Sequence, residues 1–275
     1  MPYTENKLLE KLRNIERNNY ILEDNKNYFI YSLEMMDNIG STNSILRDDL
    51  IYATLFHWIS NGIFDFKELK YLLDISLDDD HLFYKLGEIN EDSIFKRSFS
   101  VLVVALILHQ HRKSPFLTNE NLYDTKIRLI KYMIKESDLR GYIEIKGWAH
   151  SVAHCSDALD ELSKCSIFNK NDLIEILHSI KAKVCISNYV YIDEENERMV
   201  TVVESIFKSK KLDFSEVLDW LQTFTIHCRE ITYIEKFHMK VNIKSFLRSL
   251  YFRIFEEESL YFVANEIIAT LKTYN

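Results

Sequence analysis

The sequence predicts an all-α fold, and three observations support this prediction. The 275 residues include only 5 glycines and 2 prolines, whereas average usage would give about 19 and about 14. A chain so poor in both cannot form the many tight turns of a β-sandwich, nor the glycine-rich phosphate loops of nucleotide-binding α/β folds. Apolar residues recur at helical spacing between polar caps. No segment alternates apolar and polar residues for long enough to require a strand.

Capping residues place the helices along the chain. A helix that follows Ser41–Asn43 covers 45–59 and ends at Asn61–Gly62, because polar N-caps and a C-terminal glycine mark helix ends. The other expected helices cover 94–108, 119–136, 144–162, 172–184, 215–227, 243–255 and 259–272. The first of these begins near Asp92–Ser93, and three others follow the N-caps Thr118, Asn169 and Asp213. In all, we expect about ten to twelve helices joined by short loops.

The chain resembles itself at an offset of 50 residues. At this offset Arg97 lies opposite Arg47, and Arg248 lies opposite Arg198. One column is apolar in five successive rows, namely Tyr52, Leu102, Val152, Val202 and Phe252. This periodicity predicts a single α-helical repeat domain over residues 1–275, an α-solenoid-like, HEAT-like stack of about five helical hairpins. A globular α-helical bundle is the alternative architecture.

The third row of this repeat carries polar residues where the other rows are mostly apolar. His150, His154, Asp157 and Glu161 follow spacings of 4, 3 and 4, which places them on one face of a helix. Imidazoles at i and i+4 can bind one metal ion, and a carboxylate one turn later can complete the site. His150, His154 and Asp157 are therefore candidate ligands for Zn, Mn or Fe. In the alternative, the histidines are core residues, hydrogen-bonded to Asp157 or to the backbone.

A pocket is expected beside these histidines. Gly147 occupies the column of Arg47 and Arg97, so its missing side chain would leave space next to His150. The two guanidiniums suit a carboxylate or a phosphate. Each Arg can instead form a salt bridge, and the candidate partners are Asp48 or Asp49 for Arg47 and Glu91 or Asp92 for Arg97. Trp148 is expected to pack between helices, with stacking on a ligand as the alternative.

Three runs of the chain resemble a bacterial family classed as a domain of unknown function. They cover 47–59, 92–108 and 137–162, and the third contains the turn D-L-R-G (138–141) and the pattern K-G-W-A-H-x-x-A-H-x-x-D-x-L (146–159). Asp138 and Arg140 of this turn join the candidate site residues. Cys155 and Ser156 stand where the family pattern has smaller residues. The resemblance implies an all-helical fold in the bacterial cytoplasm and brings no established reaction.

Charge and cysteine usage bear on partners and compartment. The formal net charge is −8, and the chain has no long block of Lys and Arg, so we expect no nucleic-acid partner. The most apolar run, Val101 to Leu108, is much shorter than the ~20 residues of a membrane span, so we expect a buried helix and no membrane partner. The scattered cysteines predict a cytoplasmic protein. The oligomeric state is not predicted.

Two classes of function remain open. The first is a binding or scaffold role, in which a polar pocket holds a small anionic ligand or a partner peptide. The candidate binding residues are Arg47, Arg97, Asp138, Arg140, Trp148, His150, His154 and Asp157. The second is a metal-dependent hydrolase, in which the metal activates water and Arg97 or Arg47 stabilises negative charge. The binding role is favoured because no second segment with metal ligands is evident.

Overall fold

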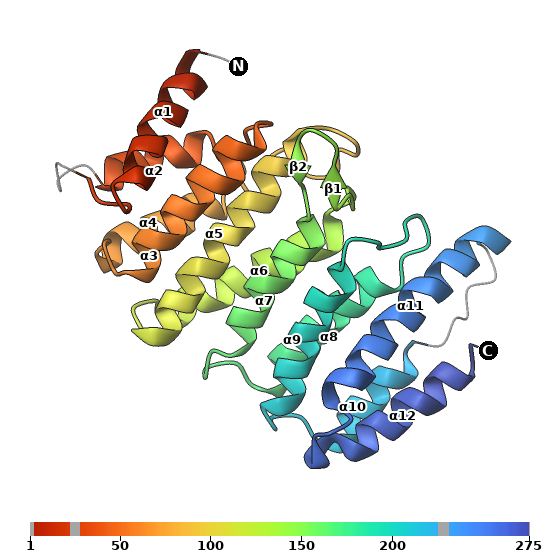
Figure 1. Cartoon of the computed structure of the whole chain (residues 1–275). Helices are drawn as coiled ribbons and strands as arrows, with labels where there is room; N and C mark the ends of the chain where they lie inside the picture. The colour runs from red at the N-terminus through yellow and green to blue at the C-terminus, as the bar shows by residue number, and fades with distance from the viewer. Residues whose placement is uncertain (1–2, 23–27, 225–230, 275) are drawn as a thin grey trace. The chain divides into compact units, whose positions relative to one another are not determined.

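The computed structural model describes residues 3–22, 28–224 and 231–274 (Figure 1). Helices dominate this part of the chain, which confirms the all-α prediction. Its helices are α1 (Tyr3–Arg17), α2 (Tyr28–Asp37), η2 (Ile45–Tyr52), α3 (Ala53–Ser60), α4 (Phe66–Ser76), α5 (Ser93–Lys113), α6 (Asn119–Lys135), α7 (Ser151–Ser163), α8 (Lys170–Val184), α9 (Glu195–Lys208), α10 (Phe214–Gln222), α11 (Tyr233–Ile254), η3 (Glu258–Leu260) and α12 (Tyr261–Lys272). Two short strands, β1 (Tyr142–Ile143) and β2 (Gly147–Trp148), pair antiparallel in a hairpin.

The predicted caps begin the helices where expected. Thr118 Oγ1 accepts a hydrogen bond from the backbone N–H of Asn121 at 3.2 Å, and Asn169 Oδ1 accepts one from Asn171 at 2.8 Å. The backbone N–H of Asp213 donates to the Glu216 carboxylate at 2.8 Å. Such bonds satisfy amide groups that have no partner within the helix. The expected helix 215–227 ends at Gln222, and its residues 225–227 lie outside the described part.

The expected helix over 144–162 is wrong in its first part. Residues 142–148 form the β1–β2 hairpin, and α7 begins only at Ser151. Ile145, Gly147 and His150 have φ angles of 70°, 80° and 45°, which a right-handed helix does not allow. The carbonyl oxygen of His150 accepts the first helical hydrogen bond from His154 N at 2.9 Å. His150 therefore precedes the helix, and Gly147 is a hairpin residue.

The contacts divide the described chain into two compact units, 1–158 and 159–275. In unit 1, α3 and α4 pack against α5, and α1 packs against η2. The run Val101 to Leu108 of α5 is 0–8% exposed, so the predicted buried helix is confirmed. Helix α5 is also long and apolar enough to cross a membrane, but most of it is buried inside the structure, as in the core helix of a soluble protein.

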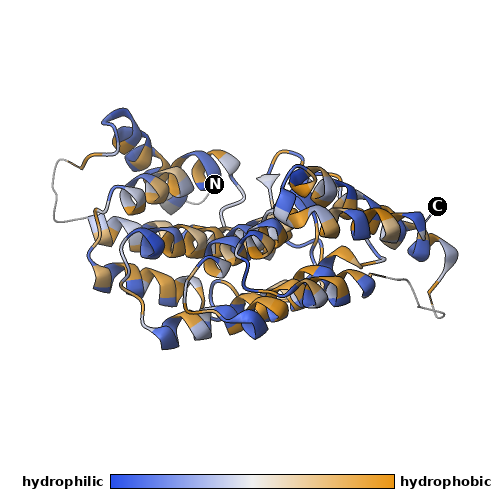
Figure 2. Ribbon diagram, turned by 90° about the horizontal axis from the view of Figure 1, so that it is seen from below, coloured by the Kyte–Doolittle hydropathy of each residue, from blue (hydrophilic) through white to orange (hydrophobic). Residues whose placement is uncertain are grey.

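Unit 2 is built around α11. Helices α8, α9 and α12 pack against it, and α10 packs against α12. The indole of Trp220 lies in this core, 2% exposed, and its Nε1 donates to the carbonyl oxygen of Leu177 at 3.1 Å. Phe224 and Phe246 stack beside it at a centroid distance of 5.8 Å. Many helices show one hydrophobic and one hydrophilic side, as expected for amphipathic helices packed on a shared core (Figure 2).

Neighbouring rows of the proposed repeat lie side by side within each unit. Helix α3 packs against α5 in unit 1, and α9 packs against α11 in unit 2 (Figure 1). Val152 and Val202 of the apolar column are buried, whereas Phe252 is 69% exposed. The single stack of five hairpins and the single domain over 1–275 stay predictions.

Candidate functional site

Arg47 connects η2 to the hairpin of unit 1. Its guanidinium is fully buried. Nη1 donates to the carbonyl oxygen of Ser41 at 2.7 Å, and Nη2 donates to those of Lys146 at 2.7 Å and Trp148 at 3.4 Å. The rings of Phe95 and Phe99 lie 4.1 and 4.6 Å from the guanidinium carbon. Arg47 therefore fixes the backbone on both sides of Gly147.

The Arg47–Asp48 salt bridge that the sequence offered is present. Arg47 Nε and Asp48 Oδ1 lie 2.7 Å apart, an ion pair without the alignment of a hydrogen bond. Burial lowers the pKa of Arg47 and raises the pKa of Asp48 to about 6, even though the guanidinium and a backbone hydrogen bond with Trp148 favour the carboxylate. Asp48 thus changes charge at a higher pH than an exposed aspartate.

Gly147 is required by a close approach between the hairpin and η2. A Cβ at this position would lie 2.8 Å from Ser44 Cβ and 3.2 Å from both Arg47 Nη2 and Asp48 Oδ2. The glycine does not open a space beside His150, as the sequence suggested. It lets the strand β2 lie directly on the buried ion pair.

Arg97 forms a buried ion pair with Glu136, and not with Glu91 or Asp92. Its Nε and Nη2 donate to the two Glu136 oxygens at 2.6 and 3.0 Å, and both side chains are at most 1% exposed. Nη1 donates to the carbonyl oxygens of Tyr84 and Lys85 at 3.1 and 3.3 Å. Although burial disfavours the cation, the hydrogen-bonded Glu136 raises the pKa of Arg97. This guanidinium is occupied by protein acceptors.

The D-L-R-G turn is held by its own ion pair. Arg140 Nε and Nη2 donate to the two oxygens of Asp138 at 2.8 and 2.6 Å. Asp138 also accepts from Asn90 N at 2.9 Å, and its carbonyl oxygen accepts from Ser151 Oγ at 2.6 Å. Arg140 Nη2 reaches the carbonyl oxygen of Glu91 at 2.8 Å. The turn therefore connects the loop before α5 to the first residue of α7.

Trp148, His150 and His154 form an aromatic group at the base of the hairpin. The Trp148 indole stacks on the His150 imidazole at a centroid distance of 4.3 Å. The Tyr142 ring meets the indole edge-on at a centroid distance of 5.0 Å. The two imidazoles lie 5.8 Å apart at 90°. Trp148 is 41% exposed, so the expected packing between helices is wrong. Its indole is part of the surface of unit 1.

His154 faces the core from α7. It is 9% exposed, and its Nδ1 lies 3.2 Å from the carbonyl oxygen of Ser98. Because a carbonyl oxygen only accepts, Nδ1 carries the proton. The Phe99 ring meets this imidazole edge-on at 5.2 Å and also contacts Arg47. This is the core histidine that the sequence gave as the alternative to a metal ligand.

The candidate metal centre has no supporting geometry in the described residues. Among residues 3–22, 28–224 and 231–274, no three His, Cys, Asp or Glu side chains are grouped as ligands of one ion. His154 and Asp157 share α7, but His150 lies before its first turn. The i, i+4 argument therefore does not apply to the two histidines, because it needs both on one helix.

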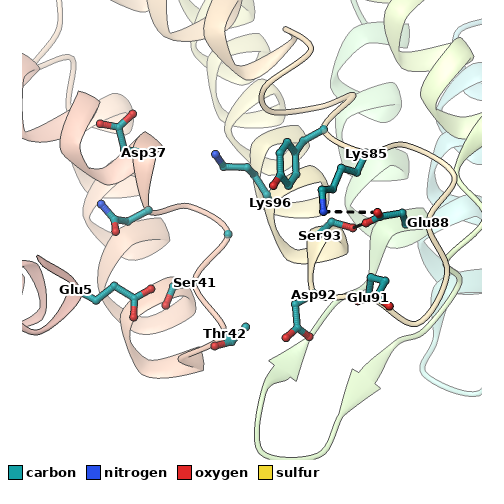
Figure 3. A pocket seen from close by; sticks show the side chains of 13 residues that line it. Glu5, Asp37, Ser41, Thr42, Lys85, Glu88, Glu91, Asp92, Ser93 and Lys96 are labelled. Carbon is teal, nitrogen blue, oxygen red and sulfur yellow. Dashed lines mark hydrogen bonds and ion pairs between the residues drawn. The ribbon is translucent and has the colours of Figure 1, made fainter. Parts of the chain in front are cut away.

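A pocket of about 530 Å³ lies beside the hairpin (Figure 3). Its charged lining consists of Glu5, Asp37, Lys85, Glu88, Glu91, Asp92 and Lys96. Asp92 joins the pocket to the hairpin, because its oxygens lie 2.7 and 2.8 Å from Lys146 Nζ. Lys85 is paired with Glu88 at 3.6 Å. Carboxylates thus outnumber lysines on this surface.

The structure brings most of the predicted residues together, in roles that differ from those expected. Arg47, Arg97, Asp138 and Arg140 support the hairpin and its loops. Sequence reasoning found the Arg47–Asp48 pair and missed the other partners. Glu136 and Asn90 lie 39 and 48 positions from the arginine and the aspartate that they bind, and only the polar D-L-R-G turn (138–141) lies next to one of them. The acid-lined pocket was also missed, because its residues come from three separated segments, near 5, 37–42 and 84–96.

The protein is thus a helical protein in which buried ion pairs support one β-hairpin. This hairpin and the acidic pocket beside it form the candidate site. The chain matches the family described as protein of unknown function (DUF2785) over residues 82–252, and it belongs to that family. The resemblance seen in the sequence is confirmed at this level. Neither a curated protein nor a solved structure matches the chain. All predicted site residues except Arg47 lie inside the matched range.

Proposed function

We propose that this protein is a binding protein, and that unit 1 holds a basic segment of a partner polypeptide. The observation that carries the proposal is the exposed indole of Trp148, stacked on His150 at 4.3 Å. Its hairpin is joined through Lys146 to Asp92 of a pocket in which carboxylates outnumber lysines. The segment would place an apolar or cationic side chain on the indole and its other cations in the pocket. Aromatic faces bind both kinds of side chain.

The rigid support of Trp148 favours a binding role. The fully buried Arg47 donates to the carbonyl oxygens of Lys146 and Trp148 and so holds the backbone that carries the indole. A surface side chain without a binding role would not need its backbone held in this way. The backbone N–H groups of Ala149 and His150 donate to the carbonyl oxygens of Gly141 and Arg140 at 2.8 and 3.1 Å. A preorganised aromatic side chain loses little conformational entropy when a partner covers it.

The charges favour a basic peptide over the small anionic ligand. Arg47, Arg97 and Arg140 donate to carbonyl oxygens or carboxylates of the protein. An anion would also meet Glu88, Glu91 and Asp92 in the pocket. A segment rich in Lys or Arg would find complementary charge there. No observation on the described residues favours the metal-dependent hydrolase.

Selection from a random peptide library tests this proposal. Random 12-residue peptides are displayed and selected on the full-length chain, and the selected peptides are measured by fluorescence anisotropy. We expect them to carry net positive charge. Trp148→Ala should weaken their binding at least about tenfold, because a central aromatic contact typically contributes 2 kcal/mol or more. Trp148→Phe should retain most of the affinity.

Phe56→Ala is the matched control for the indole. Phe56 is an aromatic residue of α3, 44% exposed, and it lines no part of the pocket. This variant should bind the peptides as the wild type does. If the selected peptides are neutral or acidic, or if Trp148→Ala binds them like Phe56→Ala, the proposed function is wrong.

A further inference from the structure

Helix α11 carries a row of cations along one side. Lys236, Lys240, Lys244 and Arg248 follow one another at intervals of four residues, and Glu235 is the one acidic residue of this helix. Residues four apart are neighbours on a helix surface, where like charges destabilise the helix. The whole chain has a net charge of −8. The positive charge of this row is therefore opposite in sign to the net charge of the protein.

Two acidic residues of the adjacent helix α9 pair with cations outside this row. Glu197 of α9 pairs with Arg253 at 2.8 Å and also accepts a hydrogen bond from Ser249. Glu204 of α9 pairs with Lys208 at 2.8 Å. Arg253, which lies outside the row, thus pairs with the carboxylate of Glu197. Lys236 and Lys240 are partly exposed and Arg248 is exposed, so these cations place positive charge at the surface of unit 2.

A groove follows the same side of α11. It has a volume of about 620 Å³ and lies between α9 and α11, lined by Asn196 and Glu197 on one side and by Lys240, Lys244 and Arg248 on the other. Phe237 and Phe252 also line it and are 49% and 69% exposed. At a rise of 1.5 Å per residue these two rings are separated by about 22 Å along the helix. The groove therefore combines a line of positive charge with an apolar residue toward each end.

We propose that this groove binds an acidic amphipathic helix of a partner protein. A helix with Asp or Glu at every fourth position presents carboxylates at intervals of about 6 Å, which is the interval of the cations on α11. Its apolar residues would cover Phe237 and Phe252, in the manner of a helix bound in a groove. The net charge of −8 opposes the approach of a whole polyanion. This proposal concerns unit 2 and does not depend on the proposed function of unit 1.

A pair of designed peptides tests the proposal. The first is a 20-residue helical peptide with Glu at every fourth position and Leu at two positions spaced to meet the phenylalanines. The second has the same composition in scrambled order. We expect the full-length protein to bind the first peptide at least about tenfold more tightly than the second, with an affinity that falls as salt rises.

Charge reversal on α11 identifies the site. Lys240→Glu combined with Arg248→Glu should weaken binding at least about tenfold. Lys181→Glu combined with Lys272→Glu changes the net charge equally on α8 and α12 and should retain binding. Lys240→Gln combined with Arg248→Gln removes the same two cations without adding negative charge and should also weaken binding. Trp148→Ala should bind the acidic helix as the wild type does. A failure of the groove proposal can therefore be distinguished from a failure of the proposed function of unit 1.

Three outcomes would overturn the proposal. The scrambled peptide binds as well as the patterned one, the two charge-reversal pairs lose equal affinity, or the protein prefers a DNA duplex or phosphatidylglycerol vesicles to the patterned peptide. The first two outcomes would show attraction to negative charge without a groove. The third would assign the row to a different class of partner.

Discussion

The guanidinium of Arg47 donates to the carbonyl oxygen of Lys146, 99 positions further along the chain, at 2.7 Å. The donor lies on η2 and the acceptor lies at the turn of the hairpin that carries Trp148. Arg47 is fully buried, and the bond satisfies part of a charge that is costly to leave unpaired. The position of the exposed indole thus depends on a side chain from another part of unit 1.

Substitution of Gly147 should destabilise the protein more than substitution of other glycines with positive φ. Gly147→Ala forces a Cβ to within 2.8 Å of Ser44 at φ +80°, so both overpacking and a left-handed backbone are penalised. We expect a loss of about 3 kcal/mol in the free energy of unfolding, measured by urea denaturation.

Gly62→Ala is the control for this substitution. Gly62 has φ +68°, but a Cβ there would have no described atom within 4 Å. The variant should lose only the backbone contribution, about 1–2 kcal/mol. Equal losses in the two variants would show that η2 and the hairpin do not pack as closely as described.

Removal of Arg97 should leave a buried charge without its partner. Arg97→Met deletes both hydrogen bonds to Glu136 in a place where the two side chains are at most 1% exposed. Breaking such a pair typically costs 3–5 kcal/mol, and Arg97→Met with Glu136→Leu should recover part of that loss. Thermal and urea unfolding measure the effect.

An exposed ion pair of the same unit serves as the comparison. Arg128 and Asp124 pair at 2.7 Å with both side chains more than a third exposed. Arg128→Met should therefore cost less than about 1 kcal/mol. Similar losses for Arg97→Met and Arg128→Met would contradict the structural role of the Arg97–Glu136 pair.

Stability should decrease as pH rises through the titration of Glu195. Burial raises the pKa of this carboxyl from 4.5 to about 7, and the residue is 1% exposed. Between these values the folded state keeps a proton that the unfolded state has released. The free energy of unfolding therefore falls as pH rises from about 4.5 to about 7.

Glu195→Gln removes this titration. The variant should match the wild type at pH 4 and exceed its stability at pH 8 by up to about 3 kcal/mol, the value of 2.5 pKa units. Glu194→Gln, at an exposed neighbouring carboxylate, is the matched control for the loss of one carboxylate. The same difference between Glu195→Gln and wild type at both pH values would be inconsistent with a raised pKa.

Local signals were sufficient to predict most helices. Thr118, Asn169 and Asp213 each begin a helix, because capping bonds form within three residues of the cap. The hairpin could not be predicted in this way. Residues 144–150 fit a helical pattern, and the positive φ of His150 accompanies a bond from its N–H to Arg140 across the hairpin.

The sequence identified the important site residues but did not predict what they do in the structure. The repeat column singled out Arg47 and Arg97, and both are structurally important. Their partners, Lys146 and Glu136, lie 99 and 39 positions away. Spacing within one helix carries no information about contacts at such separations, so the sequence offered only a ligand or nearby carboxylates as partners of the arginines. The fold instead surrounds them with protein acceptors.

The most direct test of the account is the accessibility of Trp148. Of the three tryptophans, all of them in the described residues, Trp58 and Trp220 are 1% and 2% exposed and Trp148 is 41% exposed, so acrylamide should quench mainly Trp148. Quenching is measured in full-length protein with and without a basic peptide from the library selection. We predict that the saturating peptide lowers the quenching constant severalfold in wild type, while quenching of Trp148→Phe is low with or without it. An unchanged quenching constant at saturation would show that the peptide does not cover Trp148 and would contradict the proposed binding site.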